Sequence, residues 1–118
     1  MAVILSAACA PAAVAANQNN TGIHTALISN GETFIDAQQK CSELRAGGFT
    51  DWRLPTLAES KTLHEAGVFY GLSPQSKESW TSTAGKPGMH AIIWMFNGSS
   101  NIADDTRRFK VYCVRLAG

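Results

Sequence analysis

The ten residues from Gly47 to Thr56 read GGFTDWRLPT and combine two glycines, two aromatic rings, an acid, a base and a proline. Alternate side chains of an extended chain point to opposite sides, so Asp51 and Arg53 share one side and Trp52 takes the other. We expect the indole to enter the core. We expect the guanidinium, with its five donors, to bind Asp51 and loop carbonyls that have no sheet partner. The stretch is therefore predicted to be a structural corner, because Trp, Pro and Gly at a corner more often serve packing than chemistry.

Helices are predicted on both sides of this corner. Upstream, Thr33 followed three residues later by Asp36 resembles a capping box, and the two glycines of the corner end the helical pattern. Downstream, Pro55 precedes a T-x-x-E capping box formed by Thr56 and Glu59. The apolar positions at helical spacing are Phe34, Ala37, Cys41 and Leu44 in the first helix and Leu57, Leu63 and Ala66 in the second.

Beyond the second helix the pattern changes to strands. HAIIWMFN, residues 90–97, has apolar side chains at odd and even positions, which predicts a central strand covered on both faces. The turn-forming NGSSN follows it, and RRFKVYCVRL, residues 107–116, is predicted to be the last strand. SWTST, residues 79–83, is predicted to be a shorter strand. Two helices followed by strands indicate an α+β fold, with the helices packed on a small antiparallel sheet.

Length and charge limit the possible functions. The chain has 118 residues, which suits one domain and is too short for two substantial cores. Apolar residues make up 45% and charged residues 16%, as in a packed domain. The formal net charge of +1 creates no overall field that attracts nucleic acid or an anionic membrane. A partner must therefore be recognised by a local surface, and nucleic acid is not expected to be one.

The first sixteen residues, MAVILSAACAPAAVAA, form a separate compositional unit. They carry no charged side chain, and the polar sequence NQNNTG follows them. The run is shorter than the about 20 apolar residues of a membrane span, and its small-residue end resembles a signal-peptide cleavage site. We expect residues 1–16 to be a secretion signal and residues 17–118 to be a single domain. The alternative is an apolar arm that packs on the domain or on a neighbouring subunit.

Two cysteines, Cys41 and Cys113, lie 72 positions apart in the predicted domain. In a chain that leaves the cytoplasm, a disulfide between them is the natural interpretation. Two buried free thiols are the alternative, since cysteine is often simply buried. No metal site is predicted, because neither cysteine has a partner at metal-ligand spacing and the three histidines are scattered singly.

Four motifs, in order along the chain, resemble the landmarks of one family. They are GGFTDWRLPTLAE, SWTSTA, IIWMFNGSS and VYCVRL. Together they resemble the collagen-like-protein C-terminal domain family over residues 34–116, although Ser60 stands where Leu is usual and Tyr112 where Arg is usual. The resemblance implies a C-type-lectin-like fold with long loops, in a secreted or surface-displayed bacterial or phage protein. It also implies adhesion, including binding of sulfated polysaccharide, or a variable protein of a diversity-generating retroelement.

No catalytic, cofactor or calcium site is predicted. Formylglycine-generating enzymes have a related lectin-like fold and rely on a cysteine pair available to metal, whereas the pair in this domain is expected to be a structural bridge. No motif such as G-x-S-x-G provides a nucleophile, base and orienting group. Asp104 and Asp105 supply two adjacent carboxylates, but calcium takes six or more oxygen ligands, so a solvated loop is expected there.

The ligand surface is predicted in the C-terminal half, on loops and strand ends carried by a fixed sheet. Asn, Ser and Arg beside one or two aromatic rings resemble a recognition surface, in which rings give contact area and short polar groups adapt their hydrogen bonds. The predicted binding residues are Lys86, His90, Trp94, Asn97, Ser99, Asn101, Asp104, Arg107 and Arg108. Trp94 equally suits a core position, because it alternates with apolar neighbours along its strand.

The expected ligand of this surface is a glycan or a surface protein. The basic segment TRRFK suits an anionic glycan, although such charges also keep an exposed strand edge soluble. The alternative function is a structural subunit of a surface appendage such as a pilus, or a homo-oligomer, in which the apolar residues 1–16 pack against neighbouring subunits.

Overall fold

The structure of this chain is a computed structural model that describes residues 21–68 and 76–117. The predicted signal-like segment, residues 1–16, lies outside the described residues. The elements in chain order are β2 (Ile23–Glu32), α1 (Phe34–Glu43), the short 3-10 helix η2 (Ala46–Gly48), α2 (Leu57–Glu65), β3 (Ser79–Ala84), β4 (Met89–Trp94), β5 (Ser99–Asp104) and β6 (Phe109–Leu116). Neither described α-helix is long and apolar enough to cross a membrane.

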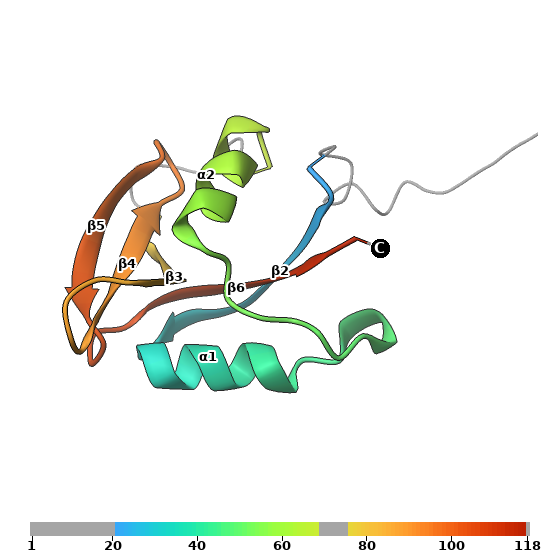
Figure 1. Cartoon of the computed structure of the whole chain (residues 1–118), viewed down its shortest axis with the longest axis horizontal. Helices are drawn as coiled ribbons and strands as arrows, with labels where there is room; N and C mark the ends of the chain where they lie inside the picture. The colour runs from blue at the N-terminus through green and yellow to red at the C-terminus, as the bar shows by residue number, and fades with distance from the viewer. Residues whose placement is uncertain (1–20, 69–75, 118) are drawn as a thin grey trace, which may run out of the picture.

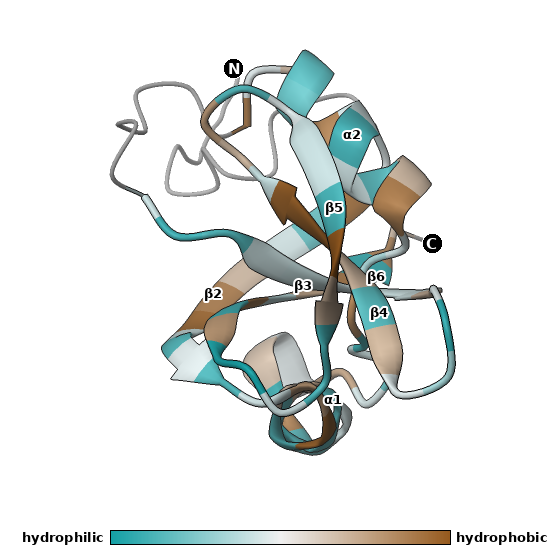
Figure 2. Cartoon of the chain, turned by 90° about the vertical axis from the view of Figure 1, so that its left-hand side faces the viewer, coloured by the Kyte–Doolittle hydropathy of each residue, from teal (hydrophilic) through white to brown (hydrophobic). Residues whose placement is uncertain are grey.

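A mixed sheet of five strands separates the two helices (Figure 1). The strand order is β2-β6-β3-β4-β5. The paired strands of the described chain are antiparallel, apart from a short parallel contact between β3 and β6. Viewed from the side of the β4–β5 hairpin, α1 lies below the sheet and α2 above it (Figure 2). The expected α+β class is confirmed, but the sheet is larger than predicted and is not purely antiparallel.

Local capping explains where both helices begin. Thr33 caps α1, because its hydroxyl accepts a hydrogen bond from the backbone N–H of Asp36 at 3.4 Å. At α2 the predicted capping box is present: the N–H of Glu59 donates to Oγ1 of Thr56 at 3.0 Å. In return the N–H of Thr56 donates to Oε1 of Glu59 at 2.9 Å. Both helices are thus fixed by residues within one turn of their ends.

The sequence predicts three of the five strands, namely β3, β4 and β6. As expected, β4 is an interior strand, with the consecutive residues Ile92 and Ile93 both buried. The two strands that the sequence prediction misses, β2 and β5, form the edges of the sheet. β5 begins at Ser99, inside the predicted turn NGSSN. Both edge strands carry many exposed or half-buried polar residues, so they lack the apolar alternation that marks a strand.

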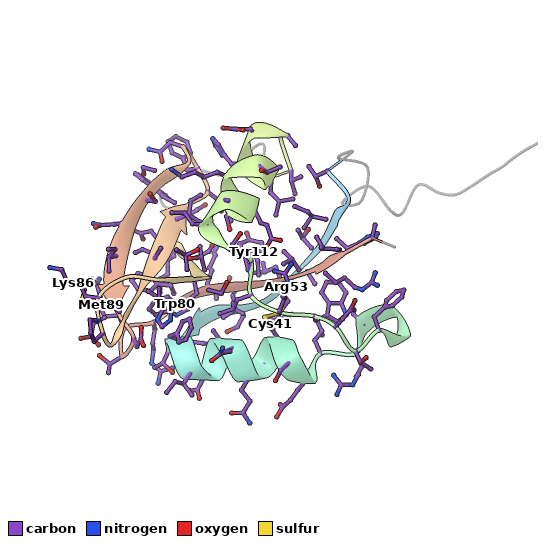
Figure 3. The ribbon with its side chains drawn as sticks, in the orientation of Figure 1. Cys41, Arg53, Trp80, Lys86, Met89 and Tyr112 are labelled. Carbon is purple, nitrogen blue, oxygen red and sulfur yellow. A yellow bond between two sulfur atoms is a disulfide. The ribbon has the colours of Figure 1, made fainter. Side chains whose placement is uncertain are left out.

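The core between α1 and the sheet contains aromatic rings and a disulfide. The ring of Trp80 makes edge-to-face contacts with Phe34 and Phe109, at centroid distances of 5.5 and 5.0 Å. Such pairs add to the stabilisation that burial itself provides. The predicted disulfide between Cys41 and Cys113 is present and ties α1 to β6. Figure 3 shows Cys41 on the sheet side of α1.

The opposite face of the sheet packs on α2. Leu63 and Val114 belong to one buried cluster, and Leu57 packs against a second cluster that contains Met95 and Tyr112. Tyr112, which stands where the resembled family usually has Arg, is buried in this layer, and burial raises the pKa of its hydroxyl. An apolar environment therefore surrounds the position at which the sequence departs from the family pattern.

Candidate functional site

Packing and hydrogen bonds hold the corner at residues 47–56 in place. Trp52 is 8% exposed, and its indole N–H donates to the carbonyl of Ala46 at 3.1 Å. The backbone of Arg53 forms an isolated antiparallel bridge with Val114 of β6, through N–H···O distances of 2.9 and 2.7 Å. The expectation that this backbone has no sheet partner is therefore wrong. The corner is joined to the last strand by its main chain.

The predicted binding of Arg53 to Asp51 is also wrong. Nη1 and Nη2 of Arg53 donate to Oε1 and Oε2 of Glu59 at 2.7 and 2.8 Å. One predicted type of partner is present, because Nη1 also donates to the carbonyl of Leu54 at 3.3 Å. The hydrogen bonds between the two side chains lower the pKa of Glu59 and raise the pKa of Arg53. The capping box explains the choice, since the same Glu59 carboxylate accepts the N–H of Thr56 and is held beside the corner.

Asp51 is bound by an arginine from the last strand. Nε of Arg115 donates to Oδ1 of Asp51 at 2.7 Å, and Nη2 donates to Oδ2 at 3.4 Å. The hydrogen bond from Arg115 lowers the pKa of the Asp51 carboxyl. The ring of Phe49 covers the guanidinium, whose central carbon lies 3.5 Å from the ring centroid, in a cation–π contact. This pairing could not be predicted from the sequence, because 64 positions separate Arg115 from Asp51.

The first glycine of the corner makes this arrangement possible. Gly47 has a φ of +69°, in the left-handed region that favours glycine. A Cβ at this position would lie 3.1 Å from Cδ2 of Phe49. A larger residue would therefore be strained and would also crowd the ring that covers Arg115.

The nine predicted binding residues lie along the β4–β5 hairpin and in the turns at its two ends. The register places Trp94 directly opposite Ser99. Because side chains alternate along a strand, Asn101 and His90 follow on the same face of the sheet. Asn97 lies in the turn that joins the two strands. We call this turn and the adjacent strand ends, with Trp94, Phe96, Asn97, Ser99 and Asn101, the aromatic end.

The other predicted residues lie at the opposite end of the hairpin. Lys86 is in the β3–β4 loop, Asp104 ends β5, and Arg107 and Arg108 are in the connection to β6. Lys86, Arg107 and Arg108 are exposed and form what we call the cationic end; Figure 3 shows Lys86 pointing away from the domain. Six residues of β4 separate the two ends, roughly 20 Å at about 3.3 Å per residue. The nine residues thus follow the hairpin and do not line one pocket.

His90 is held by the protein's own packing. Its ring stacks on Phe34, with a centroid distance of 3.5 Å and an interplanar angle of 10°. Its Nδ1 lies 2.8 Å from Oδ1 of Asp105. The N–H of Phe34 in turn donates to the carbonyl of Asp105 at 3.0 Å. These contacts join β4, the start of α1 and the connection after β5. His90 therefore helps to hold in place the connection that carries Arg107 and Arg108.

Trp94 differs from the other two tryptophans. Trp52 and Trp80 each donate the indole N–H to a backbone carbonyl, at 3.1 and 2.7 Å. The Nε1 atom of Trp94 is buried and has no hydrogen-bond partner among the described residues. The side chain as a whole is half-buried, and its ring lies 5.5 Å from the exposed ring of Phe96. The aromatic end therefore combines two neighbouring rings with an unused donor.

The two adjacent aspartates make contacts within their own turn. Oδ1 of Asp104 accepts hydrogen bonds from the N–H and hydroxyl of Thr106 at 2.9 and 2.7 Å, and these bonds lower the pKa of the carboxyl. Asp105 faces His90. Within residues 21–68 and 76–117, no three His, Cys, Asp or Glu side chains gather so that they could hold a metal ion.

The arrangement of helices and strands is similar to that of a solved structure, botrocetin, which is a C-type-lectin-like protein. The two superimpose with a TM-score of 0.56 over 81% of this chain and 92% of the botrocetin chain, at 14% sequence identity. The domain has a C-type-lectin-like fold. At this identity the similarity shows the fold alone, since one fold hosts many functions. No family model matches the chain, and no curated protein matches it in sequence.

Proposed function

We propose that this chain is a non-catalytic binding module, secreted or displayed at a cell surface, that recognises a glycan through the β4–β5 hairpin. The observation that carries the proposal is the partial exposure of the Trp94 side chain. Its side chain is half-buried, whereas those of Trp52 and Trp80 are buried, and its ring lies beside the exposed ring of Phe96. A sugar offers a flat C–H face that packs on such rings.

The polar residues beside Trp94 are oriented for hydrogen bonding. Oδ1 of Asn97 accepts the N–H of Ser99 at 2.9 Å, and Oδ1 of Asn101 accepts the N–H of Ile102 at 2.8 Å. Each bond fixes an exposed amide with its oxygen toward the chain, so the NH₂ group, with two donors, is directed away from it. Short polar groups on a rigid hairpin suit the recognition of sugar hydroxyls.

The cationic end supports an anionic substituent on the same ligand. Lys86, Arg107 and Arg108 are exposed there, on turns held by the contacts between His90 and Asp105. Guanidinium groups bind sulfate or carboxylate oxygens through paired hydrogen bonds. A chain of several sugar units that follows the hairpin would contact both ends.

An oxidising compartment is part of the proposal. The disulfide between Cys41 and Cys113 supports it, since such bonds persist mainly in proteins that leave the cytoplasm. Cleavage of residues 1–16 as a signal and variation of the C-terminal half by a retroelement stay hypotheses. The alternative function, a subunit of a surface appendage, depends on residues 1–16 and also stays a hypothesis.

The proposal is tested by probing a glycan array with the full chain and with a triple variant. The variant carries Asn97→Ala, Asn101→Ala and Arg107→Ala. We expect the full chain to bind a subset of glycans, enriched in anionic ones, and the variant to lose at least about tenfold in affinity for the strongest of them, equivalent to about 1.4 kcal/mol. Its melting temperature should stay within a few degrees, because all three side chains are exposed.

A matched control replaces exposed residues of similar kind elsewhere, namely Asn30→Ala, Gln38→Ala and Arg45→Ala. The control should bind like the unchanged chain. Retained binding by the hairpin variant would move the site away from the hairpin. An array without signal, together with binding to a surface-protein library, would replace the glycan by a protein ligand.

A further inference from the structure

A second surface lies away from the β4–β5 hairpin, at the other end of the domain. A depression of about 350 Å³ opens between β2, η2 and the end of β6. In Figure 1 the turn after α1 lies on the right and the hairpin on the left. The lining residues used below are His24, Ala26, Ala46, Phe49, Trp52 and Arg115. None of the nine predicted binding residues lines this depression, which we call the Arg115 depression.

Arg115 supplies this depression with unused hydrogen-bond donors. The residue is 6% exposed, and its two hydrogen bonds to Asp51 use Nε and one N–H of Nη2. A guanidinium has five N–H donors, so the other three have no acceptor among the described residues. Nη1 is not among the buried side-chain atoms that lack a partner, so solvent reaches it and the acceptor of a ligand could take the place of that solvent. The free edge, Nη1 with Nη2, has the geometry that binds a carboxylate through two parallel bonds.

The charge of Arg115 is only partly compensated. Asp51 holds it through one short and one long hydrogen bond, of 2.7 and 3.4 Å. The Asp51 side chain is 60% exposed, so solvent and salt screen its negative charge. His24 lies directly opposite Arg115 in the register of β2 and β6, on the same face of the sheet, and also lines the depression. A second nitrogen donor thus stands beside the guanidinium.

Aromatic rings form the remaining wall. Phe49 is exposed, and Trp52 contributes to the lining although most of its ring is in the core. Ala26 and Ala46 leave the floor and rim without long side chains. A volume of this size lies at the small end of the range for ligand pockets and suits a molecule the size of one sugar ring.

We propose that the Arg115 depression binds a sugar acid, with the carboxylate on the free edge of Arg115 and the pyranose ring against Phe49 and Trp52. A purely structural role for Arg115 explains its bonds to Asp51 and its contact with Phe49. It does not explain an open depression beside unused donors. The proposal is independent of the hairpin site, because the two sites share no residue.

The experiment follows the indole N–H signal of Trp52 in ¹⁵N-labelled full chain during titration with glucuronate. Glucose and acetate serve as comparison ligands at matched ionic strength. We expect saturation with glucuronate at a Kd on the order of 1 mM, as for a small ligand held by few contacts. Glucose lacks the carboxylate and acetate lacks the ring, so each should bind at least about tenfold more weakly.

Two pairs of variants locate the site. Ala46→Trp fills the depression, and its control is Ala58→Trp at an exposed position of α2. The side chain of Ala46 can be enlarged because its carbonyl, and not its methyl group, holds Trp52. Phe49→Leu removes a flat ring, and its control is Phe96→Leu at the aromatic end. We expect the Ala46 and Phe49 variants to weaken glucuronate binding at least about tenfold and threefold, Ala58→Trp to leave it unchanged, and Phe96→Leu, in the hairpin site, to weaken it less than Phe49→Leu.

If the Trp52 signal did not move at glucuronate concentrations well above the expected Kd, the proposal would be overturned. Equal binding of acetate would reduce the site to a small-anion site and would equally contradict a sugar acid. If Phe96→Leu weakened glucuronate binding and Phe49→Leu did not, the sugar acid would belong to the hairpin, so the two proposals fail separately.

Discussion

The ion pair between Arg53 and Glu59 provides the sharpest test of how the corner is held. The test is a double-mutant cycle with Arg53→Gln, Glu59→Gln and the double variant. Glutamine keeps an oxygen that can accept the N–H of Thr56, so the capping box of α2 persists while the charge is lost. The cycle therefore isolates the interaction between the two side chains.

The expected coupling energy follows from the geometry and exposure of the pair. Two charge-assisted hydrogen bonds of 2.7 and 2.8 Å would contribute about 1.5–3 kcal/mol if they were buried. Fully exposed ion pairs contribute about 0.2–1 kcal/mol. The side chains of Arg53 and Glu59 are 42% and 20% exposed, so solvent screening reduces the energy toward the lower range. We expect a coupling of about 1–1.5 kcal/mol in the free energy of unfolding.

Urea unfolding followed by tryptophan fluorescence measures the four free energies of unfolding. A parallel cycle with Asp51→Asn serves as the control, because Arg53 makes no hydrogen bond with Asp51 in the structure. The two charges attract each other without a hydrogen bond, so this second cycle should show a coupling clearly smaller than that with Glu59. A coupling with Asp51 that exceeds the coupling with Glu59 would refute the assignment and restore the pairing that the sequence suggested.

The remaining predictions concern stability. Replacing both Cys41 and Cys113 by Ala should lower the free energy of unfolding by about 4 kcal/mol, as the chain-entropy model gives for a separation of 72 residues. Thiol labelling of the denatured, unreduced wild type should detect neither cysteine. The folded-state pKa of Glu59 lies below its ordinary 4.5, so the charged carboxylate stabilises the fold above that pH, and this stabilisation is lost as the pH falls through the lowered pKa. The urea midpoint should therefore decrease between about pH 5 and 3. The decrease should be smaller in Glu59→Gln, which lacks the titrating group. Ser60→Ala should raise the free energy of unfolding by about 1 kcal/mol in thermal or urea unfolding, because its buried hydroxyl has no partner among the described residues and Ala favours helix; a loss of stability would show that the hydroxyl is bonded.

Features determined by neighbouring residues could be predicted from the sequence. The caps at Thr33 and Thr56 define both helix starts, because each bond spans three residues. The interior strands β4 and β6 have apolar residues at consecutive positions, which a strand buried on both faces requires. The edge strands β2 and β5 could not be predicted, because their exposed polar residues lack a period of two.

Partners that are distant in the chain could not be predicted. Asp51 and Glu59 both lie close to Arg53 along the chain. The three-dimensional path of the corner decides which carboxylate it binds. Arg115 reaches Asp51 because β6 returns beside the corner after 64 residues. The Arg115 depression depends on the same return of the chain, so no local motif marks it.

The sequence proposes the residues of the candidate site but not their arrangement, and their role in binding stays a prediction. Without β5, the register that places Trp94 opposite Ser99 could not be inferred. The sequence therefore suggested one binding face on loops and strand ends, where the structure has a hairpin with two ends. The role of His90 also required the structure, because its stacking partner Phe34 begins a helix more than fifty residues earlier.

The central claim is that the hairpin binds the glycan selected on the array. The chain has three tryptophans, so its three indole N–H signals report on the corner, the core and the hairpin separately. The decisive measurement is a titration of ¹⁵N-labelled chain with the glycan that binds most strongly on the array. We predict that the signal of Trp94 moves to saturation while that of Trp80 in the core stays in place; the signal of Trp52 reports separately on the Arg115 depression. A saturable interaction that leaves the Trp94 signal unmoved would contradict the claim.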